Sequence, residues 1–469
     1  MMRALPAQGI AANEVLRELA ALREHDLPTH GGRLFAYVYD PALDGLDELA
    51  AAAYAMSSHV NGLDPTAFPS LLAMENDLVA AAAHTLGGPP STVGSVTSGG
   101  TESLILAVKA ARDARPDIAE PRLVMPVTAH AALAKAGAYL RVALDTVPVD
   151  PSTFRVDPAA MAAAIGPSTV LVACSAPSYA HGLIDPIADI AGAALAAGVR
   201  CHVDACFGGW TLPYLRRLGE PVPPFDLSVP GVTSISVDLH KYAYTPKGVS
   251  ILLHRDEALR APQYFGYADW PGYTMVNPVV SSTRSGGPIA AAWATLRHIG
   301  DDGYLSLATR TRDATRAIAA AVASVEDLTV VPVESTVVAF MSTTVDLFVL
   351  ADELAARGWH TQPQFRHGNI PPSVHLTVTA AVAPRVQDFA TDLTAAVKAA
   401  RALGPVELPP GIFELLGSVE DLAGALGLGA GGKLPDRMAL INTLLNTAPP
   451  EVRERLLISF LSLLQRPAW

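Results

Sequence analysis

Three apolar segments in the middle of the chain constrain its fold most strongly. Residues 169–175, 199–204 and 233–238 are almost continuously apolar, and an alanine-rich helical stretch at 187–197 precedes the second. Apolar strands that alternate with helices are typical of a parallel sheet covered on both faces. The same alternation begins near residue 90, with strands expected at 91–97 and 122–126 and helices at 102–114 and 130–139. The sequence therefore predicts an α/β fold with a mostly parallel central sheet.

A smaller region is expected after this sheet. A long helical pattern begins around 301–309, and strands are expected at 328–341 and 374–379 with a helix at 345–357 between them. The tail after Gly404 is rich in Gly, Pro and Leu, and a terminal helix pair fits it. We therefore expect three parts, which are an N-terminal segment (1–60), a large domain (61–305) and a small α+β domain with a helical tail (306–469).

Charge and cysteine content exclude several classes of protein. The formal net charge is −12, so neither nucleic acid nor an anionic membrane is expected as the main partner, because both require a basic face. Three cysteines without CxxC spacing predict neither a disulfide framework nor a zinc site, and no metal is expected. The N-terminus lacks the apolar region of a signal peptide, and no segment reaches the ~20 apolar residues that span a bilayer. We expect a cytoplasmic protein without a transmembrane segment.

Polar residues stand where the predicted strands end, and ligands of open α/β sheets bind at these ends. In the stretch TSGGTES, Gly99, Gly100 and Thr101 lie between a strand and a helix. Backbone N–H groups there can hold a phosphate, although a plain turn is the alternative. His130 begins a helix and is either a structural histidine or a flat ring stacked on a cofactor. Asp204 ends a strand and is either a helix cap or a carboxylate paired with a cationic ring nitrogen.

Lys241 lies between two apolar runs, in the stretch SVDLHKYAYTPKGVSILLHR. Lysine is among the residues least often buried, so this one either reaches solvent or is reactive. An amine in an apolar pocket loses its proton more easily and becomes a nucleophile. Together, a phosphate cradle, a ring-stacking histidine, a carboxylate and this lysine predict a pyridoxal 5'-phosphate enzyme with a Schiff base on Lys241.

Residues from about 32 to about 379 carry motifs that resemble those of the sphingosine-1-phosphate lyases, in the group II decarboxylase branch of fold-type I pyridoxal phosphate enzymes. The blocks VTSGGTES, SAPSYAHGLIDPI, CHVDACFGGW, HKYAYTPKG and STRSGG occur in the family's order. The resemblance implies a homodimer whose sites are built from both subunits, and an aldimine on Lys241. The residues that it implies around the cofactor are Gly100, Thr101, His130, Asp204, His240 and Thr283. Those that it implies near a small-molecule amine substrate are Tyr39, Asn61, His181 and Lys247.

The blocks on the substrate side depart from the family pattern. The family has SNPLH where this chain has VNGLD, so Asp64 stands at the place of a histidine. A carboxylate there would repel a phosphorylated headgroup. HKYGY has become HKYAY, which ends at Tyr244, and GGxYxSP has become GYTMVNP, so that Met275 or Tyr273 stands for the family's tyrosine. The cofactor half of the site matches the family, whereas the substrate half has drifted.

We interpret the sequence as that of a lyase for a 2-amino-3-hydroxy compound, such as a phosphorylated sphingoid base, which it would cleave to an aldehyde and an amine. Lys247, His181 and Tyr39 are the candidates for proton transfer, and the sequence does not rank them. The alternative is amino acid decarboxylation, for which Arg284 could bind the carboxylate; a contact with a neighbouring subunit is its other interpretation. A third hypothesis is a cofactor-binding scaffold without catalysis, against which the retained lysine, aspartate and histidine argue.

Overall fold

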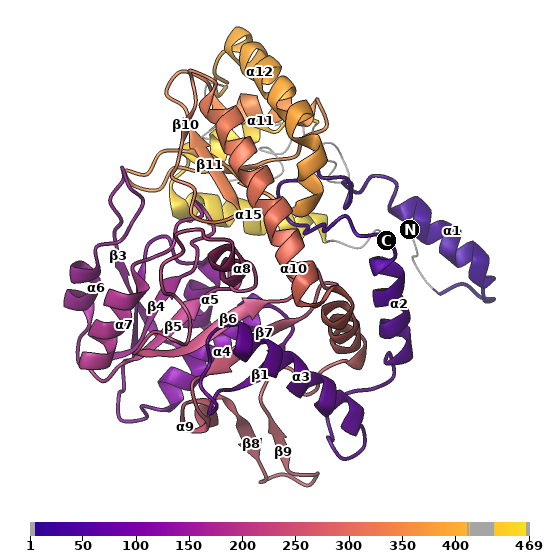
Figure 1. Cartoon of the computed structure of the whole chain (residues 1–469), viewed down its shortest axis with the longest axis vertical. Coiled ribbons are helices and arrows are strands. Elements are labelled where there is room, and N and C mark those ends of the chain that lie inside the picture. Colours follow the sequence, from indigo (N-terminus) through magenta and orange to yellow (C-terminus); the bar gives the residue numbers. More distant parts are fainter. Residues whose placement is uncertain (1–4, 410–411, 413–435, 466–469) are drawn as a thin grey trace.

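The computed structural model describes residues 5–409, 412 and 436–465. A seven-stranded sheet lies at the centre of its larger part (Figure 1). Its strands are β1 (Val93–Thr97), β2 (Arg122–Pro126), β3 (Ala143–Val147), β4 (Thr169–Ser175), β5 (Arg200–Asp204), β6 (Val232–Asp238) and β7 (Ser250–His254). In space they follow the order β1-β7-β6-β5-β4-β2-β3. The predicted α/β fold with a mostly parallel sheet is confirmed.

One strand of this sheet, β7, runs against the others. Strands β2 to β6 pair in parallel, whereas β7 is antiparallel to both β6 and β1. Only residues 239–249 connect β6 to β7, and a parallel return requires a longer crossover. Because β1 and β6 both oppose β7, they run in the same direction, and their carboxyl ends lie at one edge of the sheet.

Helices cover both faces of the large sheet. Strand β4 shows why its sequence is continuously apolar: Leu171 and Ala173 pack in one core, and Val172 and Cys174 pack in another. Successive side chains of a strand point to opposite faces, so both faces of β4 must be apolar. The helices of this part are α2 (Leu46–Met56), α3 (Pro69–Thr85), α4 (Gly100–Asp113), α5 (Ala131–Leu140), α6 (Pro158–Ala164), α7 (Ile187–Ala196), α8 (Leu212–Arg217) and α9 (Glu257–Arg260).

A long helical segment, α10 (Gly286–Ala323), is kinked at Gly300, whose φ of 64° is not helical, and it connects the large part to a smaller one (Figure 1). The predicted boundary near residue 305 falls inside this helix, and the division into domains stays a prediction. The smaller part has an antiparallel sheet in the order β10-β11-β13-β12. Its elements are β10 (Thr329–Val330), β11 (Val337–Met341), α11 (Leu347–Ala355), β12 (Gln362–Gln364), β13 (Ser373–Thr377) and α12 (Val386–Leu403).

The single strand predicted at 328–341 is wrong, because β10 and β11 are separate strands. Pro332 lies between them and cannot donate a ladder hydrogen bond. Glu334, in the same connection, forms an ion pair with Arg155 and accepts a hydrogen bond from the backbone N–H of Ile184 at 3.0 Å. This connection therefore leaves the small sheet and contacts the large part.

The described part of the tail contains a helix pair, α14 (Ala439–Thr447) and α15 (Pro450–Leu464). Asp352 on α11 accepts hydrogen bonds from the backbone N–H groups of Met438 and Ala439, which joins the start of α14 to the small part. Residues 410–411 and 413–435 of the predicted tail lie outside the described residues. None of the described helices is long and apolar enough to cross a bilayer.

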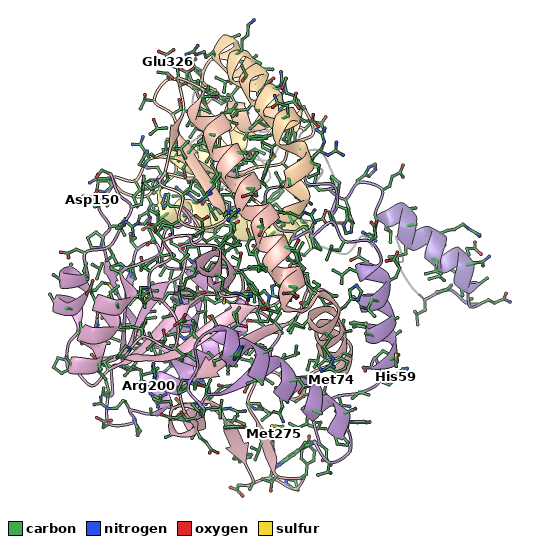
Figure 2. The ribbon with its side chains drawn as sticks, viewed as in Figure 1. His59, Met74, Asp150, Arg200, Met275 and Glu326 are labelled. Carbon is green, nitrogen blue, oxygen red and sulfur yellow. The ribbon has the colours of Figure 1, made fainter. Side chains whose placement is uncertain are left out.

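Two elements extend from the body of the chain. Helix α1 (Ala12–Leu22) has no buried residue and projects to one side next to α2 (Figure 1). A hairpin of β8 (Phe265–Tyr267) and β9 (Met275–Asn277) carries an exposed aromatic surface. Figure 2 places Met275, on this hairpin, at the opposite end of the molecule from Glu326.

Candidate active site

The carboxyl ends of β1, β4, β5 and β6 open into one cavity of about 460 Å³. Because these strands run in the same direction, residues far apart in the sequence follow them at the same edge. Eight residues predicted from the sequence line this cavity: Gly99, Gly100, Thr101, His130, Asp204, His240, Lys241 and Lys247.

The cavity has a cradle at the start of α4. A side chain at Gly100 would come within 2.7 Å of the Cys206 Sγ and within 3.0 Å of both carboxylate oxygens of Asp238, so only glycine fits. The missing side chain leaves the first N–H groups of α4 uncovered, and such groups bind anions. Glu102 closes the turn before the helix, since it accepts hydrogen bonds from the Ser98 N–H and hydroxyl at 2.6 and 2.8 Å.

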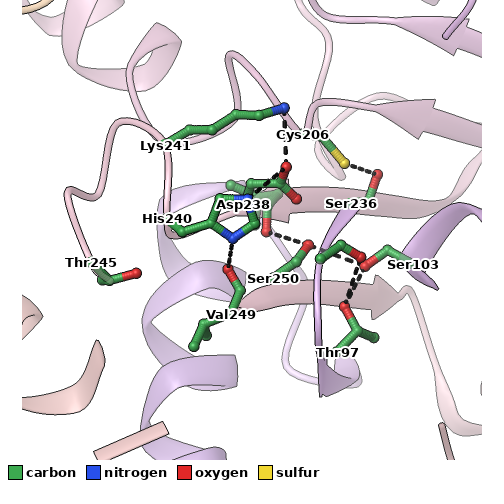
Figure 3. A network of polar contacts seen from close by, with 12 residues as sticks. Thr97, Ser103, Cys206, Ser236, Asp238, His240, Lys241, Thr245, Val249 and Ser250 are labelled. Carbon is green, nitrogen blue, oxygen red and sulfur yellow. Dashed lines mark hydrogen bonds and ion pairs between the residues drawn. The ribbon is translucent and has the colours of Figure 1, made fainter. Parts of the chain in front are cut away.

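Lys241 is held by a carboxylate that the sequence prediction missed. The turn after β6 brings its Nζ within 3.0 Å of the Asp238 Oδ2 (Figure 3). Burial alone would lower the pKa of Lys241, as expected from the sequence, but the negative groups around the amine, with Asp238 first among them, together outweigh burial and raise the pKa. The expectation that this amine loses its proton easily is therefore wrong for the free lysine. An aspartate at the end of an apolar strand, three residues before the lysine, was the signal that could have identified it.

Asp204 and His130 face the cavity from the ends of two other segments. Asp204 ends β5, is 7% exposed, and accepts a hydrogen bond from the Cys206 N–H at 3.0 Å. His130 caps α5, where its Nδ1 accepts from the Ala132 N–H at 3.2 Å. A ring nitrogen that accepts from a backbone N–H carries no proton, so the capping contact leaves Nε2 as the protonated nitrogen of the neutral ring.

Lys247 and Tyr39 lie together beside the cavity. The Lys247 Nζ is 5.2 Å from the centroid of the Tyr39 ring, and this ring packs edge-on against Tyr242 and Phe207. Burial, together with the charge of Lys241, lowers the pKa of Lys247. Burial raises the pKa of Tyr39 well above its ordinary value, so this phenol keeps its proton.

Two predicted residues lie away from this cavity. His181 lines a second cavity of about 320 Å³, which adjoins the first at His130 and Tyr179. Its ring stacks on Phe154 at 4.3 Å, and burial lowers its pKa to about 4. The Tyr244 hydroxyl is 3.5 Å from that of Thr311 on α10, inside the core.

The four remaining predicted residues form a peripheral group that does not line the cavity. The Thr283 hydroxyl is 3.4 Å from Oδ1 of Asn61, and Arg284 forms an ion pair with the buried Glu75 at 2.6 Å. Asp64 is exposed and accepts hydrogen bonds from the N–H and hydroxyl of Thr66 at 2.8 and 2.6 Å. Within one chain the side chains of Asn61 and Thr283 therefore contact each other, Arg284 pairs with Glu75 and Asp64 with Thr66, and none of the four lines the cavity of Lys241.

The groups at the cavity fit pyridoxal phosphate. The open N–H groups after Gly100 suit its phosphate, Asp204 offers a buried carboxylate to its ring nitrogen, and Lys241 offers an amine to its aldehyde. A volume of about 460 Å³ is typical of a small-molecule site.

Comparisons with known proteins agree with this geometry. Residues 29–342 match the family described as "Pyridoxal-dependent decarboxylase conserved domain", and residues 394–463 match "Pyridoxal-dependent enzyme, C-terminal putative HTH domain". Sphingosine-1-phosphate lyase from Arabidopsis thaliana is 36% identical over 94% of this chain and 79% of its own length. The Dictyostelium discoideum lyase is 38% identical over 84% of this chain and 74% of its own length.

Comparison with solved structures also finds a sphingosine-1-phosphate lyase. A sphingosine-1-phosphate lyase from Burkholderia pseudomallei superposes with a TM-score of 0.82 and 33% identity, covering 90% of this chain and 97% of its own. Glutamate decarboxylase from Lactobacillus brevis, at 20% identity and a TM-score of 0.77 over 87% of this chain and 96% of its own, shares the fold. This chain belongs to the pyridoxal-dependent decarboxylase family and, within it, to the sphingosine-1-phosphate lyases.

Proposed function

We propose that this chain is a pyridoxal phosphate-dependent lyase that cleaves the C2–C3 bond of a phosphorylated sphingoid base, or of a similar 2-amino-3-hydroxy compound, to an aldehyde and an amine. The observation that carries the proposal is the presence of two lysines at one cavity, Lys241 after β6 and Lys247 beside Tyr39. One amine is needed to attach the cofactor, and a second group is needed to take the proton of the C3 hydroxyl.

The residues around the cofactor would each supply one interaction. When bound, pyridoxal phosphate accepts the electrons left on C2 after the bond breaks. Lys241 anchors it, and the buried Asp204 keeps its ring nitrogen protonated, because a nearby carboxylate favours a cation. The start of α4 binds the phosphate, and His130 covers one face of the ring.

Among the three candidates for proton transfer, the geometry favours Lys247. It lines the cavity, and its lowered pKa increases the fraction of neutral amine that can accept a proton near neutral pH. Tyr39 keeps its proton and positions the lysine through its ring. His181 lines the neighbouring cavity, and Lys241 does not line that one.

Decarboxylation of an amino acid has less support at this site. An arginine that binds a substrate carboxylate should face the cavity, but the described residues that line it include none. Arg284, the candidate for that role, is already paired with Glu75 at 2.6 Å.

We also propose that the enzyme is a homodimer in which Asn61 and Thr283 of the peripheral group complete the cavity of the partner. Support comes from the position of Asn61 and Thr283, which contact each other but lie outside the cavity of their own chain. Mixing Lys241→Ala protein with Thr283→Ala protein after subunit exchange should restore about a quarter of the wild-type activity, because half of the random dimers carry one intact site of two. No recovery, with exchange verified by mass spectrometry, would contradict shared sites.

A cytoplasmic location is proposed as well. All three cysteines, Cys174, Cys201 and Cys206, are free and buried, as is usual in a reducing compartment. The protein should co-fractionate with a cytoplasmic marker enzyme, and recovery outside that fraction would contradict the proposal.

The activity can be tested with purified protein and dihydrosphingosine 1-phosphate. We expect a long-chain aldehyde by mass spectrometry, at a rate that Lys241→Ala abolishes and that Lys398→Gln, on the exposed side of α12, leaves unchanged. Carbon dioxide release from amino acids without any aldehyde would instead support the decarboxylase interpretation.

A further inference from the structure

The Asp238 carboxylate lies between the lysine and the phosphate cradle. It is 3% exposed, at the end of β6, and its Oδ2 is 3.0 Å from the Lys241 Nζ. Both of its oxygens face Gly100, where any side chain would collide with them, and Oδ1 has no hydrogen-bond partner in the described part of the chain. A buried carboxylate is costly unless it is paired with a cation. Its ionised form therefore depends on the cationic groups around it.

A second cation can form at the same oxygen. The His240 Nε2 is 3.6 Å from Oδ2 of Asp238, and the His240 Nδ1 is 2.8 Å from the carbonyl oxygen of Val249 (Figure 3). A carbonyl only accepts hydrogen bonds, so Nδ1 carries the proton of the neutral ring. Neutral His240 thus presents an unprotonated Nε2 toward Asp238, and this contact becomes an ion pair only when Nε2 gains a proton.

Attachment of a cofactor to Lys241 changes which cation compensates the charge of the Asp238 carboxylate. While the lysine is free, its ammonium is the cation nearest to Asp238. The carboxylate is then compensated without a charge on His240. When Nζ becomes bonded to the aldehyde carbon of pyridoxal phosphate, this ammonium is consumed. Asp238 would then lose its nearest partner and keep His240 as the other one within reach.

We propose that Asp238 is a positioning residue that pairs with the Lys241 ammonium while the lysine is free and with a protonated His240 once the lysine carries the cofactor. In this exchange one ammonium proton moves to the Nε2 of His240. The two remaining hydrogens leave with the aldehyde oxygen as water, and a carbon–nitrogen double bond forms. The charge at Asp238 stays compensated before and after the step.

The exchange would link attachment of the aldehyde to binding of the phosphate. A side chain atom at Gly99 would lie 3.7 Å from the Cε1 of His240, so this ring borders the cradle. A cation that forms there would strengthen phosphate binding at the moment when the aldehyde is bound. This inference rests on the use of pyridoxal phosphate and not on the lyase substrate, so its test uses no substrate.

The test measures two properties of cofactor-free protein. The first is the pH midpoint at which Lys241 becomes modified by pyridoxal, trapped with borohydride and located by peptide mass spectrometry. The second is the phosphate preference, which is the ratio of the dissociation constants of pyridoxal and pyridoxal 5'-phosphate. Asp238→Asn removes the charge and keeps the shape. We expect it to lower the pH midpoint by about 1–3 units and to reduce the phosphate preference about 10- to 100-fold.

His240→Gln should change the two measured properties in a different way from Asp238→Asn. It removes the proton acceptor, so the phosphate preference should fall by a similar factor while the pH midpoint moves upward. In the double variant the phosphate preference should fall no further than in either single variant, because both act through one pair. None of these variants changes the other titratable groups that face Asp238 or His240, which are Tyr39, Cys206, Lys241 and Lys247.

Asp226→Asn is the matched control, since Asp226 is equally buried and pairs with Arg216 at 3.1 Å away from the cavity. It should leave both properties unchanged. Additive losses of phosphate preference in the double variant would overturn the proposal, and so would an unchanged pH midpoint in His240→Gln. The latter variant keeps the proposal testable even if Asp238→Asn does not fold.

Discussion

The cofactor side and the substrate side of the site differ in how the chain assembles them. On the cofactor side, Gly100, Asp204 and Lys241 come from the ends of three strands and line one cavity. On the substrate side, Asn61 lies outside that cavity, and so does its contact Thr283, which was predicted beside the cofactor phosphate. Strands that run in the same direction bring the residues at their carboxyl ends together at one edge of the sheet.

One chain therefore brings eight of the predicted residues to one cavity and leaves the peripheral group outside it. The peripheral residues have settled contacts of their own, such as the buried pair of Glu75 and Arg284. If such a residue also contributes to a site in another subunit, it must do so while it keeps these contacts. If the two sides are as separate as their geometry indicates, a variant on one side should leave the measured properties of the other side unchanged.

The largest effect is expected at Lys247, which lines the cavity. Lys247→Gln should lower kcat about 10²–10⁴-fold, because general acid–base groups typically contribute this much. Cofactor binding, followed by absorbance, should change little, since Lys241 remains. A loss of the cofactor band with the loss of rate would mean that Lys247 holds the cofactor instead of moving a proton.

A large effect on stability is expected on the peripheral side. Arg284→Gln should lower the free energy of unfolding by about 3–5 kcal/mol, because it leaves the carboxylate of Glu75 buried without a cation. Urea denaturation measures this, and Glu75→Gln combined with Arg284→Gln should recover part of the loss. If Arg284 instead binds a substrate carboxylate, the single variant would raise KM for an amino acid and leave stability nearly unchanged.

A moderate effect is expected at the ring that faces the cofactor. His130→Ala should weaken cofactor binding about 3- to 10-fold, as expected for the loss of one aromatic contact. His130→Phe retains a flat ring and should bind the cofactor more tightly than the alanine variant, although both lose the capping hydrogen bond to Ala132. Equal cofactor affinities of the two variants would show that the loss of affinity comes from the capping hydrogen bond and not from the ring.

The smallest effect is expected at Asp64. Its carboxylate is exposed and hydrogen-bonded to Thr66, and these bonds lower its pKa, so it is charged at neutral pH. Asp64→His should lower KM for dihydrosphingosine 1-phosphate about two- to fivefold, and mainly at low salt, because exposed charges interact weakly and are screened. An unchanged KM at low salt would place Asp64 away from the headgroup in the assembled enzyme.

Much of the large part was predictable because its signals are local. The apolar run of β4 and the glycines before α4 each follow from a few neighbouring residues. The separation of β10 from β11 was missed, since Glu334 leaves the small sheet to pair with Arg155, 179 residues away. Asp238 was missed because an aspartate at a strand end has many ordinary uses.

The sequence by itself determined the α/β fold and the cofactor, and it predicted Lys241 as the lysine that would carry it, because strand ends and motif blocks are continuous in the chain. Only the tertiary structure decided the charge state of that lysine and the partner of Arg284. Burial predicted a lowered pKa for Lys241, but the surrounding negative groups, with Asp238 first among them, together raise it. Arg284 meets Glu75 across 209 residues. Electrostatic effects depend on distance in space, and folding alone sets that distance.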